Sequence, residues 1–508
     1  MTLSVQHIGI VGTGVMGAGI AQIAAQAGYD VWLFDSREGA ASTARDKLTG
    51  TLHWLADKGK MPPAAADAAI SHLNIVDTLD QLAHCHVVVE AIVEHLEAKH
   101  NLFAELENIV AQDAILATNT SSLSVTSIAA GLQHPSRVAG FHFFNPVPLM
   151  KVIEVIGGME TDPAVVDDLL ALAEQLGHTG VRAKDTPGFI VNHAGRAYGT
   201  EGLKILEEYV TTPAEIDRIL REGAGFRMGP LELFDLTGMD VSHPAMESIY
   251  AQFYHDPRYR PSYLSQQRLT GNRLGRKTGI GFYRYEDGKR VAEPQPLAPP
   301  QLKEWPPVWV GCDDPDTREQ VAALLSTLGC HIETSELPGP TALCLLVPLG
   351  EDATSASVRF GTDPARSVCL DALVGLDRHR TVMLTPVTRA DMRDAAHAML
   401  SADGVGVSVI RDSVGFVAQR VLAAVVNLAC EIAQRSIATP EDIDNAVRLG
   451  LNYPRGPLQW GDELGPQKLL TILERMCELT GDPRYRPSPW LRRRAILGAS
   501  LLQHEPNI

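Results

Sequence analysis

The stretch His7-Ile8-Gly9-Ile10-Val11-Gly12-Thr13-Gly14-Val15-Met16-Gly17 decides the fold at the start of this chain. An apolar run typical of a β-strand leads directly into the pattern G-x-G-x-x-G, and a helical pattern follows. Gly12 permits a tight turn, Gly14 lets the backbone approach a pyrophosphate, and Gly17 lets the helix pack closely on the strand. The helix N-terminus would offer free N–H groups to that pyrophosphate. The stretch therefore predicts a dinucleotide-binding βαβ unit.

A carboxylate at the end of the next predicted strand, residues 30–34, indicates which dinucleotide binds. Asp35 follows that strand at the distance where a side chain can hold a ribose 2′-hydroxyl. It would repel a 2′-phosphate, so it favours NAD over NADP. Arg37 is the one neighbouring side chain that favours NADP.

Bulk composition narrows the class of protein. The 508 residues are 45% hydrophobic and 21% charged, typical of globular protein, and the length predicts three or four domains. A net charge of −17 argues against nucleic acid or an anionic membrane as a partner. The seven cysteines show no C-x-x-C spacing, so we expect reduced thiols and no metal site. Because the chain enters a strand at once and holds no apolar run near the roughly 20 residues of a membrane span, we expect a cytoplasmic protein.

Alternating strand and helix patterns predict the architecture. Short apolar strands recur at 87–89, 115–117, 138–141 and 151–156, with a helical tract over 39–74 broken near 61–63 and another helix over 163–176. This alternation predicts a doubly wound, Rossmann-like α/β domain over residues 1–184. An all-α domain over 185–290 follows, with helices expected at 189–208, 213–222 and 230–253, and then a Pro-rich linker over 291–307.

The remainder repeats the first half. Four motifs return in the same order: 185–192 as 412–419, 212–217 as 439–444, 229–235 as 456–462, and 256–262, letter for letter, as 482–488. We therefore expect a second helical copy over 412–508. Residues 308–411 carry short apolar strands but no G-x-G-x-x-G, and are interpreted as a degenerate α/β domain.

Three polar positions in the first half are candidates for chemistry. Asn119, with Ser121 two residues on, follows a strand whose carboxyl end should face a ligand, although a helix N-cap explains the same residues. His142 ends a strand, where neutral imidazole could accept a hydroxyl proton near pH 7. Glu154 lies in an apolar strand, where an unpaired carboxylate is costly. If the two strands are neighbours, Glu154 can bond the imidazole; the alternative is a Glu facing solvent from an edge strand.

These residues resemble the 3-hydroxyacyl-CoA dehydrogenase family. The matching motifs are GTGVMG at Gly12, EAIVE at Glu90, NTSSLS at Asn119, FHFFNPVPLMKVIEVI at Phe141 and DTPGFIVN at Asp185. The resemblance continues through GAGFRMGPLELFDLTG and RLGRKTGIGFY, and with the second copy it covers almost the whole chain. The long, duplicated 3-hydroxyadipyl-CoA dehydrogenases of phenylacetate catabolism are the most similar group.

The resemblance implies a role for each matching residue. His142 would be the catalytic base and Glu154 its partner, in the NAD-dependent oxidation of a (3S)-3-hydroxyacyl-CoA. Ser121 and Asn192 would bind the substrate oxygens, and Lys58 and Lys60 the phosphates of CoA. The implied cofactor-binding residues are Gly12, Gly14, Met16, Gly17, Asp35, Glu90, Lys99 and Asn119.

The sequence departs from the family pattern at two places. His193 stands where an arginine usually follows the Asn192 equivalent, which puts in doubt whatever that arginine stabilises. In the second copy Asn192 maps to Gln419, and the ungapped register places Cys369 at the position of His142. We therefore expect the second half to be structural, packing on the first helical domain as an internal dimer partner, with further oligomerisation open.

Other functions stay open at this point. A substrate with a second carboxylate, such as an adipyl chain, would need a cation nearby, and Arg196 and Arg227 are the candidates. A 3-hydroxybutyryl-CoA dehydrogenase, a dehydrogenase for free 3-hydroxy acids, and a non-catalytic NAD-binding structural protein are the alternatives. The family of free-acid enzymes would require a lysine in the interdomain helix, where this chain offers Asn192 and His193.

Overall fold

The computed structural model describes residues 5–291, 297–302 and 304–506. The described residues form two compact units: the first comprises 5–193, 432–452 and 504–506, and the second comprises 194–291, 297–302, 304–431 and 453–503. Of the predicted linker, 292–296 and 303 lie outside the described residues, and the rest of it forms no helix or strand.

An eight-stranded sheet in the order β3-β2-β1-β4-β5-β6-β7-β8 forms the centre of the first unit. All neighbouring strands are parallel except β6 and β7, which form an antiparallel pair. The order reverses between β1 and β4, and in such sheets the ligand binds at the carboxyl ends of the strands beside that point. The strands are His7–Val11, Asp30–Phe34, Leu73–Ile75, Val87–Glu90, Ile115–Thr118, Val138–Phe143, Val152–Gly157 and Thr179–Lys184, for β1 to β8.

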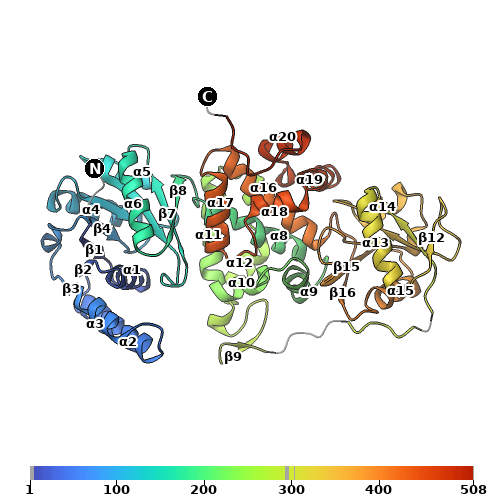
Figure 1. The fold of residues 1–508 in the computed structure, drawn as a ribbon, viewed down its shortest axis with the longest axis horizontal. Helices are drawn as coiled ribbons and strands as arrows, with labels where there is room; N and C mark the ends of the chain where they lie inside the picture. Colours follow the sequence, from blue (N-terminus) through green and yellow to red (C-terminus); the bar gives the residue numbers. More distant parts are fainter. Residues whose placement is uncertain (1–4, 292–296, 303, 507–508) are drawn as a thin grey trace. The chain divides into compact units, whose positions relative to one another are not determined.

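Helices cover both faces of this sheet because its strands are apolar on both sides. Val87 and Val89 pack into one core cluster and Val88 into the other. The first cluster includes residues of α1, α2, α3 and α6, and the second includes residues of α4 and α5. The helices are α1 (Val15–Gln26), α2 (Ala40–Asp57), α3 (Pro63–Ser71), α4 (Leu96–Ile109), α5 (Val125–Ala129), α6 (Pro163–Gln175) and α7 (Val191–Ala194). Figure 1 shows α2 and α3 as a hairpin beside β3.

The structure corrects the predicted elements in three places. The helical tract over 39–74 is divided near the predicted break but ends earlier than predicted, because α3 ends at Ser71 and Leu73–Ile75 form β3. His142 lies within β6 rather than at its end. The edge strand β8 was not predicted, because its alternation of exposed and buried residues is short and polar. The Rossmann-like fold itself is confirmed.

The second unit contains the first helical copy and most of the second. Its helices in copy 1 are α8 (Arg196–Glu207), α9 (Pro213–Arg218), α10 (Pro230–Thr237), α11 (Met239–Gln252) and α12 (Tyr263–Thr270), followed by the strands β9 (Tyr285–Glu286) and β10 (Lys289–Arg290). Three predicted helices are therefore interrupted: 189–208 divides into α7 and α8, 213–222 ends in a π-helical turn, Ile219–Gly223, and 230–253 is broken at Gly238, whose φ of 90° suits glycine.

Copy 2 repeats this helix order. It contains α16 (Val417–Gln434), α17 (Pro440–Gly450), α18 (Pro457–Leu464), α19 (Pro466–Thr480) and α20 (Pro489–Leu497). Thr212 and Thr439 occupy the same N-cap position, each accepting a bond from a backbone N–H three residues on, and each precedes a proline. By length and apolarity α16 could cross a membrane, but 89% of it is buried, as in the core helix of a globular protein.

A six-stranded sheet separates the two helical copies in sequence, with the order β12-β11-β13-β14-β15-β16. It is parallel except for the antiparallel pair β14–β15, so it reproduces the pattern of β6, β7 and β8. Its strands are Val308–Gly311, Ile332–Glu333, Leu343–Leu346, Ser367–Leu370, His379–Leu384 and Gly406–Ile410, for β11 to β16; its helices are α13 (Pro315–Thr327), α14 (Ala353–Arg359) and α15 (Ala390–Leu400).

Candidate active site

The glycines of the β1–α1 turn leave room for a diphosphate. Gly12 has φ 97°, and a Cβ there would lie 2.6 Å from the Ala91 carbonyl oxygen. A Cβ on Gly17 would lie 1.8 Å from the Gly12 carbonyl oxygen, so strand and helix could not pack this closely. A Cβ on Gly14 would meet nothing within 4 Å, and no side chain caps α1. The amino end of α1 is thus open for an anion, as the predicted NAD site requires.

Asp35 lies beside this turn at the end of β2. It accepts hydrogen bonds from the Thr13 backbone N–H at 2.9 Å and from the Thr13 hydroxyl at 2.8 Å. Arg37 forms three further bonds, from Nε at 3.0 Å and from Nη2 and its backbone N–H at 3.1 Å each. These bonds together with those from Thr13 lower the pKa of the Asp35 carboxyl against the effect of burial. The turn opens onto a cleft of about 660 Å³, lined also by Asn145–Pro148.

The predicted contact between His142 and Glu154 is present. The two residues face each other in the antiparallel register of β6 and β7, and His142 Nδ1 lies 2.6 Å from Glu154 Oε2. Both side chains are buried, Glu154 completely. Its other oxygen, Oε1, accepts bonds from the backbone N–H groups of Ile190 and Val191, at 2.9 and 2.8 Å. Glu154 is therefore not the solvent-facing residue of the alternative interpretation.

This geometry determines which imidazole nitrogen is available. A carboxylate at Nδ1 holds the proton there, so Nε2 carries the lone pair that can accept a proton. The ring lies among aromatic side chains, with its centroid 4.4 Å from that of Phe144 and 5.8 Å from that of Phe189. An imidazole held in this way has a fixed tautomer and can accept a proton at Nε2.

Asn119 and Ser121 lie at the carboxyl end of β5, as predicted. Asn119 Oδ1 accepts a hydrogen bond from the Phe143 backbone N–H at 2.9 Å, which links this loop to the residue after His142. The Ser121 backbone N–H donates to Glu94 Oε1 at 2.9 Å. Glu94 Oε1 also accepts bonds from the hydroxyl groups of Thr120, at 2.7 Å, and Ser122, at 2.9 Å. One carboxylate therefore organises the whole loop.

Glu90 and Lys99 form a buried ion pair. The Lys99 ammonium lies 2.5 Å from Glu90 and 3.2 Å from Glu94, and it is buried together with Glu90. Glu90 also accepts bonds from the Thr118 hydroxyl and the Ile92 backbone N–H, so its carboxylate is fully engaged inside the protein. Glu94 is the acid of this group that reaches Ser121. Burial favours its neutral form, but Lys99 and the hydroxyl bonds lower the pKa of Glu94 overall.

Sequence reasoning missed Glu94, although it is the last letter of the EAIVE motif. Both glutamates stand in that motif, and only their packing distinguishes their roles: Glu90 is the last residue of β4 and is fully buried, whereas Glu94 lies beyond the end of the strand.

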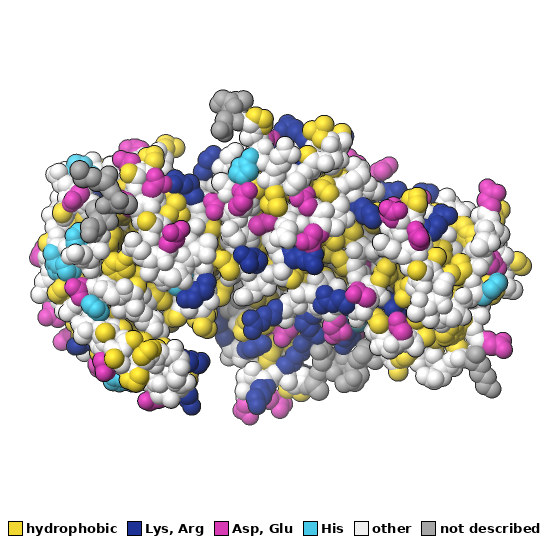
Figure 2. All heavy atoms as spheres, in the orientation of Figure 1, with side chains coloured by type: hydrophobic (Ala, Val, Ile, Leu, Met, Phe, Trp, Pro, Cys, Tyr) yellow, Lys and Arg dark blue, Asp and Glu magenta, His cyan; other side chains and the backbone are white. Residues whose placement is uncertain are grey.

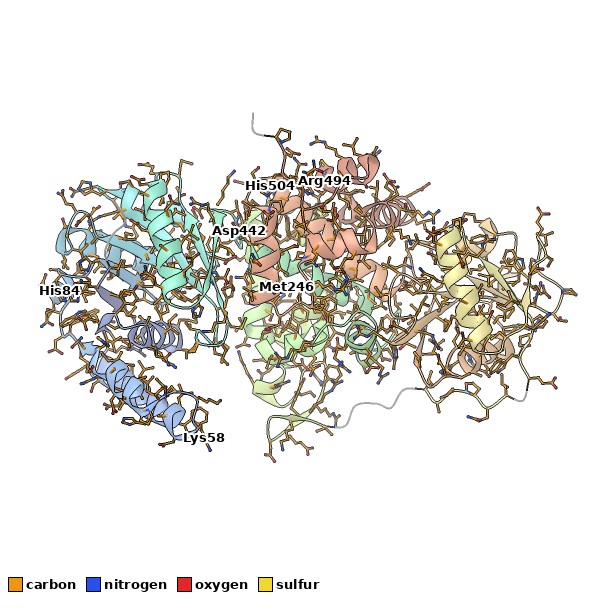
Figure 3. The ribbon with its side chains drawn as sticks, in the orientation of Figure 1. Lys58, His84, Met246, Asp442, Arg494 and His504 are labelled. Carbon is orange, nitrogen blue, oxygen red and sulfur yellow. The ribbon has the colours of Figure 1, made fainter. Side chains whose placement is uncertain are left out.

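The remaining predicted residues lie on α7, after the end of α2 and in the second unit. Asn192 is half-buried on α7, and His193 beside it is fully buried. Lys58 and Lys60 are exposed after the end of α2; Figure 3 shows Lys58 at the free end of the α2–α3 hairpin, where Lys and Arg side chains are also visible in Figure 2. Arg196 and Arg227 belong to the second unit, and their predicted role stays a prediction.

The second helical copy retains an arginine at the position of His193. Arg420 is fully buried, and its Nε lies 2.8 Å from Glu201 of α8. It also bonds Glu208, at 2.6 Å, and the Tyr485 hydroxyl. In this copy the arginine thus joins the two helical repeats, so it has a structural role at this position.

The strand register corrects the predicted equivalent of His142 in the second half. The Asp371 backbone N–H donates to Thr381, extending the β14–β15 ladder. Since Thr381 pairs with Ser408 as Glu154 pairs with Val181, Asp371 and Thr381 correspond to His142 and Glu154. The prediction of Cys369 was wrong because the connection between these strands is two residues shorter than the one between β6 and β7.

In the part of the chain that the structure describes, no three or more His, Cys, Asp or Glu side chains form a group that could hold a metal ion. All seven cysteines are free thiols.

Comparison with known proteins agrees with the geometry. The model of the 3-hydroxyacyl-CoA dehydrogenase NAD-binding domain matches residues 7–186, and that of the C-terminal domain of the same family matches twice, at 188–285 and 415–500. The chain is 37% identical over 497 residues to a 3-hydroxyadipyl-CoA dehydrogenase of Escherichia coli K12, covering 98% of this chain and 99% of that protein. A probable 3-hydroxybutyryl-CoA dehydrogenase of Bacillus subtilis is 39% identical over 285 residues, which is 56% of this chain and 99% of that protein.

A solved structure extends the likeness to three dimensions. The crystal structure of a 3-hydroxybutyryl-CoA dehydrogenase from Escherichia coli K12 superposes with a TM-score of 0.85 at 36% identity, covering 97% of this chain and 99% of that one. The open diphosphate turn, the Asp35 carboxylate and these matches lead to one conclusion. The chain belongs to the 3-hydroxyacyl-CoA dehydrogenase family and is an NAD-dependent oxidoreductase.

Proposed function

We propose that the protein oxidises (3S)-3-hydroxyadipyl-CoA to the 3-oxoacyl-CoA, with His142 as the general base. The buried pair of His142 Nδ1 and Glu154 Oε2, 2.6 Å apart, carries this proposal. The choice of acyl chain is supported by the name of the Escherichia coli relative, which matches this chain over nearly its full length.

His142 accepts the proton of the C3 hydroxyl at Nε2, while the C3–H bond breaks and the C3–O bond becomes a carbonyl. Bound NAD⁺ supplies the acceptor for the hydride that leaves C3. Glu154 stabilises the imidazolium that forms, and it stays in place because two backbone N–H groups hold its other oxygen. The complete burial of Glu154 strengthens each of these interactions.

The other predicted residues bind rather than react. Ser121 and Asn192 hold the substrate oxygens and bring C3 close to the base. Gly12, Gly14, Met16, Gly17 and Asp35 hold the dinucleotide; Lys99 and Asn119 complete its site, Lys99 by fixing Glu94. We assign Glu90 to support of Lys99. Lys58 and Lys60 would meet the phosphates of CoA as exposed cations.

A second candidate substrate is 3-hydroxybutyryl-CoA. It is supported by the Escherichia coli crystal structure with a TM-score of 0.85, which is that of a protein named 3-hydroxybutyryl-CoA dehydrogenase. The first test is the decrease in absorbance at 340 nm with acetoacetyl-CoA and NADH, which should be rapid. Comparison of kcat/KM for the adipyl and butyryl substrates then shows which acyl chain the enzyme prefers. If Arg196 or Arg227 binds the second carboxylate, its change to alanine lowers kcat/KM for the adipyl substrate alone.

We also propose that the second helical copy takes the place of a dimer partner. Two reciprocal contacts within the second unit support this. The Arg258 guanidinium donates to the Arg486 carbonyl oxygen at 3.3 Å, and Arg484, its equivalent, donates to that of Arg260 at 3.2 Å. Such exchange of equivalent contacts is the mark of a two-fold interface. A fragment of residues 1–290 should therefore dimerise or lose activity; a soluble, fully active monomer would contradict the proposal.

A further inference from the structure

One helix of the second repeat belongs to the compact unit that contains His142 and Glu154. This helix, α17, contacts both β7 and β8, and Figure 1 shows it beside β8. Its buried residues form one stripe at helical spacing: Pro440, Ile443, Ala446, Val447 and Gly450. The apolar face of α17 therefore packs within this unit, on the edge of the sheet that carries the proposed base and its partner.

A backbone hydrogen bond fixes the segment just before α17 to that edge. β8 is the last strand of the sheet, and the Lys184 backbone N–H donates to the Ile437 carbonyl oxygen at 2.9 Å. Burial raises the pKa of the Asp442 carboxyl on α17, labelled in Figure 3, and the Arg182 backbone N–H on β8 opposes that rise. The second repeat thus satisfies an N–H group of an open strand edge, as a further strand would.

The close approach of α17 occurs at Gly450. A Cβ on this residue would lie 2.9 and 3.0 Å from the two γ-carbons of Val191, and 3.4 Å from a γ-carbon of Val152 on β7. Real Cβ atoms do not approach other carbons so closely, so the absence of a side chain is what lets α17 contact Val191 directly. Any larger residue at 450 must displace Val191 or the helix.

Hydrogen bonds connect Val191 to the proposed reacting groups. Its backbone N–H donates to Glu154 Oε1 at 2.8 Å, and Glu154 Oε2 binds His142 Nδ1 at 2.6 Å. We propose that α17 is a positioning element of the active site, and that Gly450 acts by holding Val191 where its N–H orients Glu154. This inference rests on the proposed role of His142 as base. In this proposal the second repeat contributes to catalysis by positioning Glu154, although it contains no general base of its own.

The change Gly450→Ala tests the inference. We expect kcat to fall by about ten- to a hundredfold, because a displacement near 1 Å in a catalytic array can cost about a hundredfold. KM for acetoacetyl-CoA and Kd for NADH should stay within about twofold, since neither ligand is proposed to bind α17. The matched control is Gly223→Ala at the equivalent position of the first repeat, where a Cβ would meet only the His379 carbonyl oxygen, at 3.3 Å. That variant should retain its kcat.

A second pair of variants separates positioning from general damage. Val191→Ala removes the two γ-carbons that a Cβ at 450 would strike, so the double variant should recover to within about threefold of Val191→Ala alone. An unchanged kcat in Gly450→Ala, an equal loss in Gly223→Ala, or no recovery in the double variant would overturn the inference. If Gly450→Ala does not fold, Val191→Ala tests the inference instead. We expect this variant to lose kcat while its Kd for NADH stays unchanged, and a wild-type kcat would contradict the inference. A fully active His142→Ala enzyme would instead reject the proposed function.

Discussion

Two clefts of this protein share one arrangement of strands and helices. They differ in most of the side chains that stand at the positions of the proposed site. Three residues join β1 to α1, and three join β11 to α13. In the first cleft they are Gly12, Thr13 and Gly14; in the second they are Cys312, Asp313 and Asp314. Carboxylates therefore stand where the first cleft has open backbone, and Asp314 forms an ion pair with Lys468 at 2.9 Å.

The same replacement extends to the rest of the second cleft, which has a volume of about 490 Å³. Six residues separate β5 from α5 and β13 from α14, so Val347 and Leu349 occupy the positions of Asn119 and Ser121. Asp371 and Thr381 replace the base and its partner, and Gln419 Nε2 donates to Asp371 at 3.0 Å. β11 pairs directly with β13, so within the described residues β4 and α4, which carry Glu90, Glu94 and Lys99, have no counterpart.

The comparison indicates that the sheet determines the shape of each cleft, whereas a few side chains at the strand ends determine the chemistry that the cleft can support. Apolar strands keep the fold while the polar residues at their ends change freely, since those residues contribute little to the core. Changing matched residues of the two clefts tests this in four ways.

The largest effect is expected from the base. His142→Ala should lower kcat by about a hundredfold or more, because a positioned general base contributes roughly two to four decades. The Kd for NADH, measured by fluorescence, should be unchanged. Asp371→Ala, the equivalent change in the second cleft, should leave kcat within about twofold. Near-normal turnover of His142→Ala would reject the assignment.

The next effect concerns the diphosphate turn. Gly14→Asp gives the first cleft the residue of the second, and we expect NADH affinity to fall by about a hundredfold, because a carboxylate would take the N–H groups and repel the phosphates. Calorimetry on the unchanged protein should give one NADH per chain. Two equivalents would show that the second cleft still binds the dinucleotide.

A smaller effect is expected at the substrate oxygens. Asn192→Gln copies Gln419, keeps the amide and lengthens the side chain by one methylene. The loss in kcat/KM should be about tenfold, with NADH binding unaffected, because the amide is displaced from the reacting centre. Gln419→Asn serves as the control and should retain wild-type kcat/KM.

The smallest effect is a pH dependence of stability. Burial raises the pKa of Asp371 to about 6, against the bonds from Gln419 and the Leu373 backbone N–H. A carboxyl with a raised pKa in the folded state is destabilising once it must ionise, so stability should fall as pH rises from about 4 to about 6 and stay lower above that. Asp371→Asn should match the unchanged protein at pH 4 and exceed it at pH 8 by roughly 2 kcal/mol in unfolding free energy. Equal stability of the two proteins at pH 8 would contradict this.

The amino-acid sequence alone determined the dinucleotide fold and the duplication, and it identified His142 and Glu154 as candidates, whereas the antiparallel register of β6 and β7 decided that they meet. The sequence could do this because turn glycines, strand runs and a polar residue in an apolar strand act through local spacing. The tertiary structure decided the rest. Only strand pairing shows that Asp371 replaces His142, since the shorter connection shifts the register there by two residues. Only packing distinguishes Glu94 from Glu90, and only packing brings Gly450 to Val191 across more than 250 residues of chain, because no local pattern records which distant side chains meet.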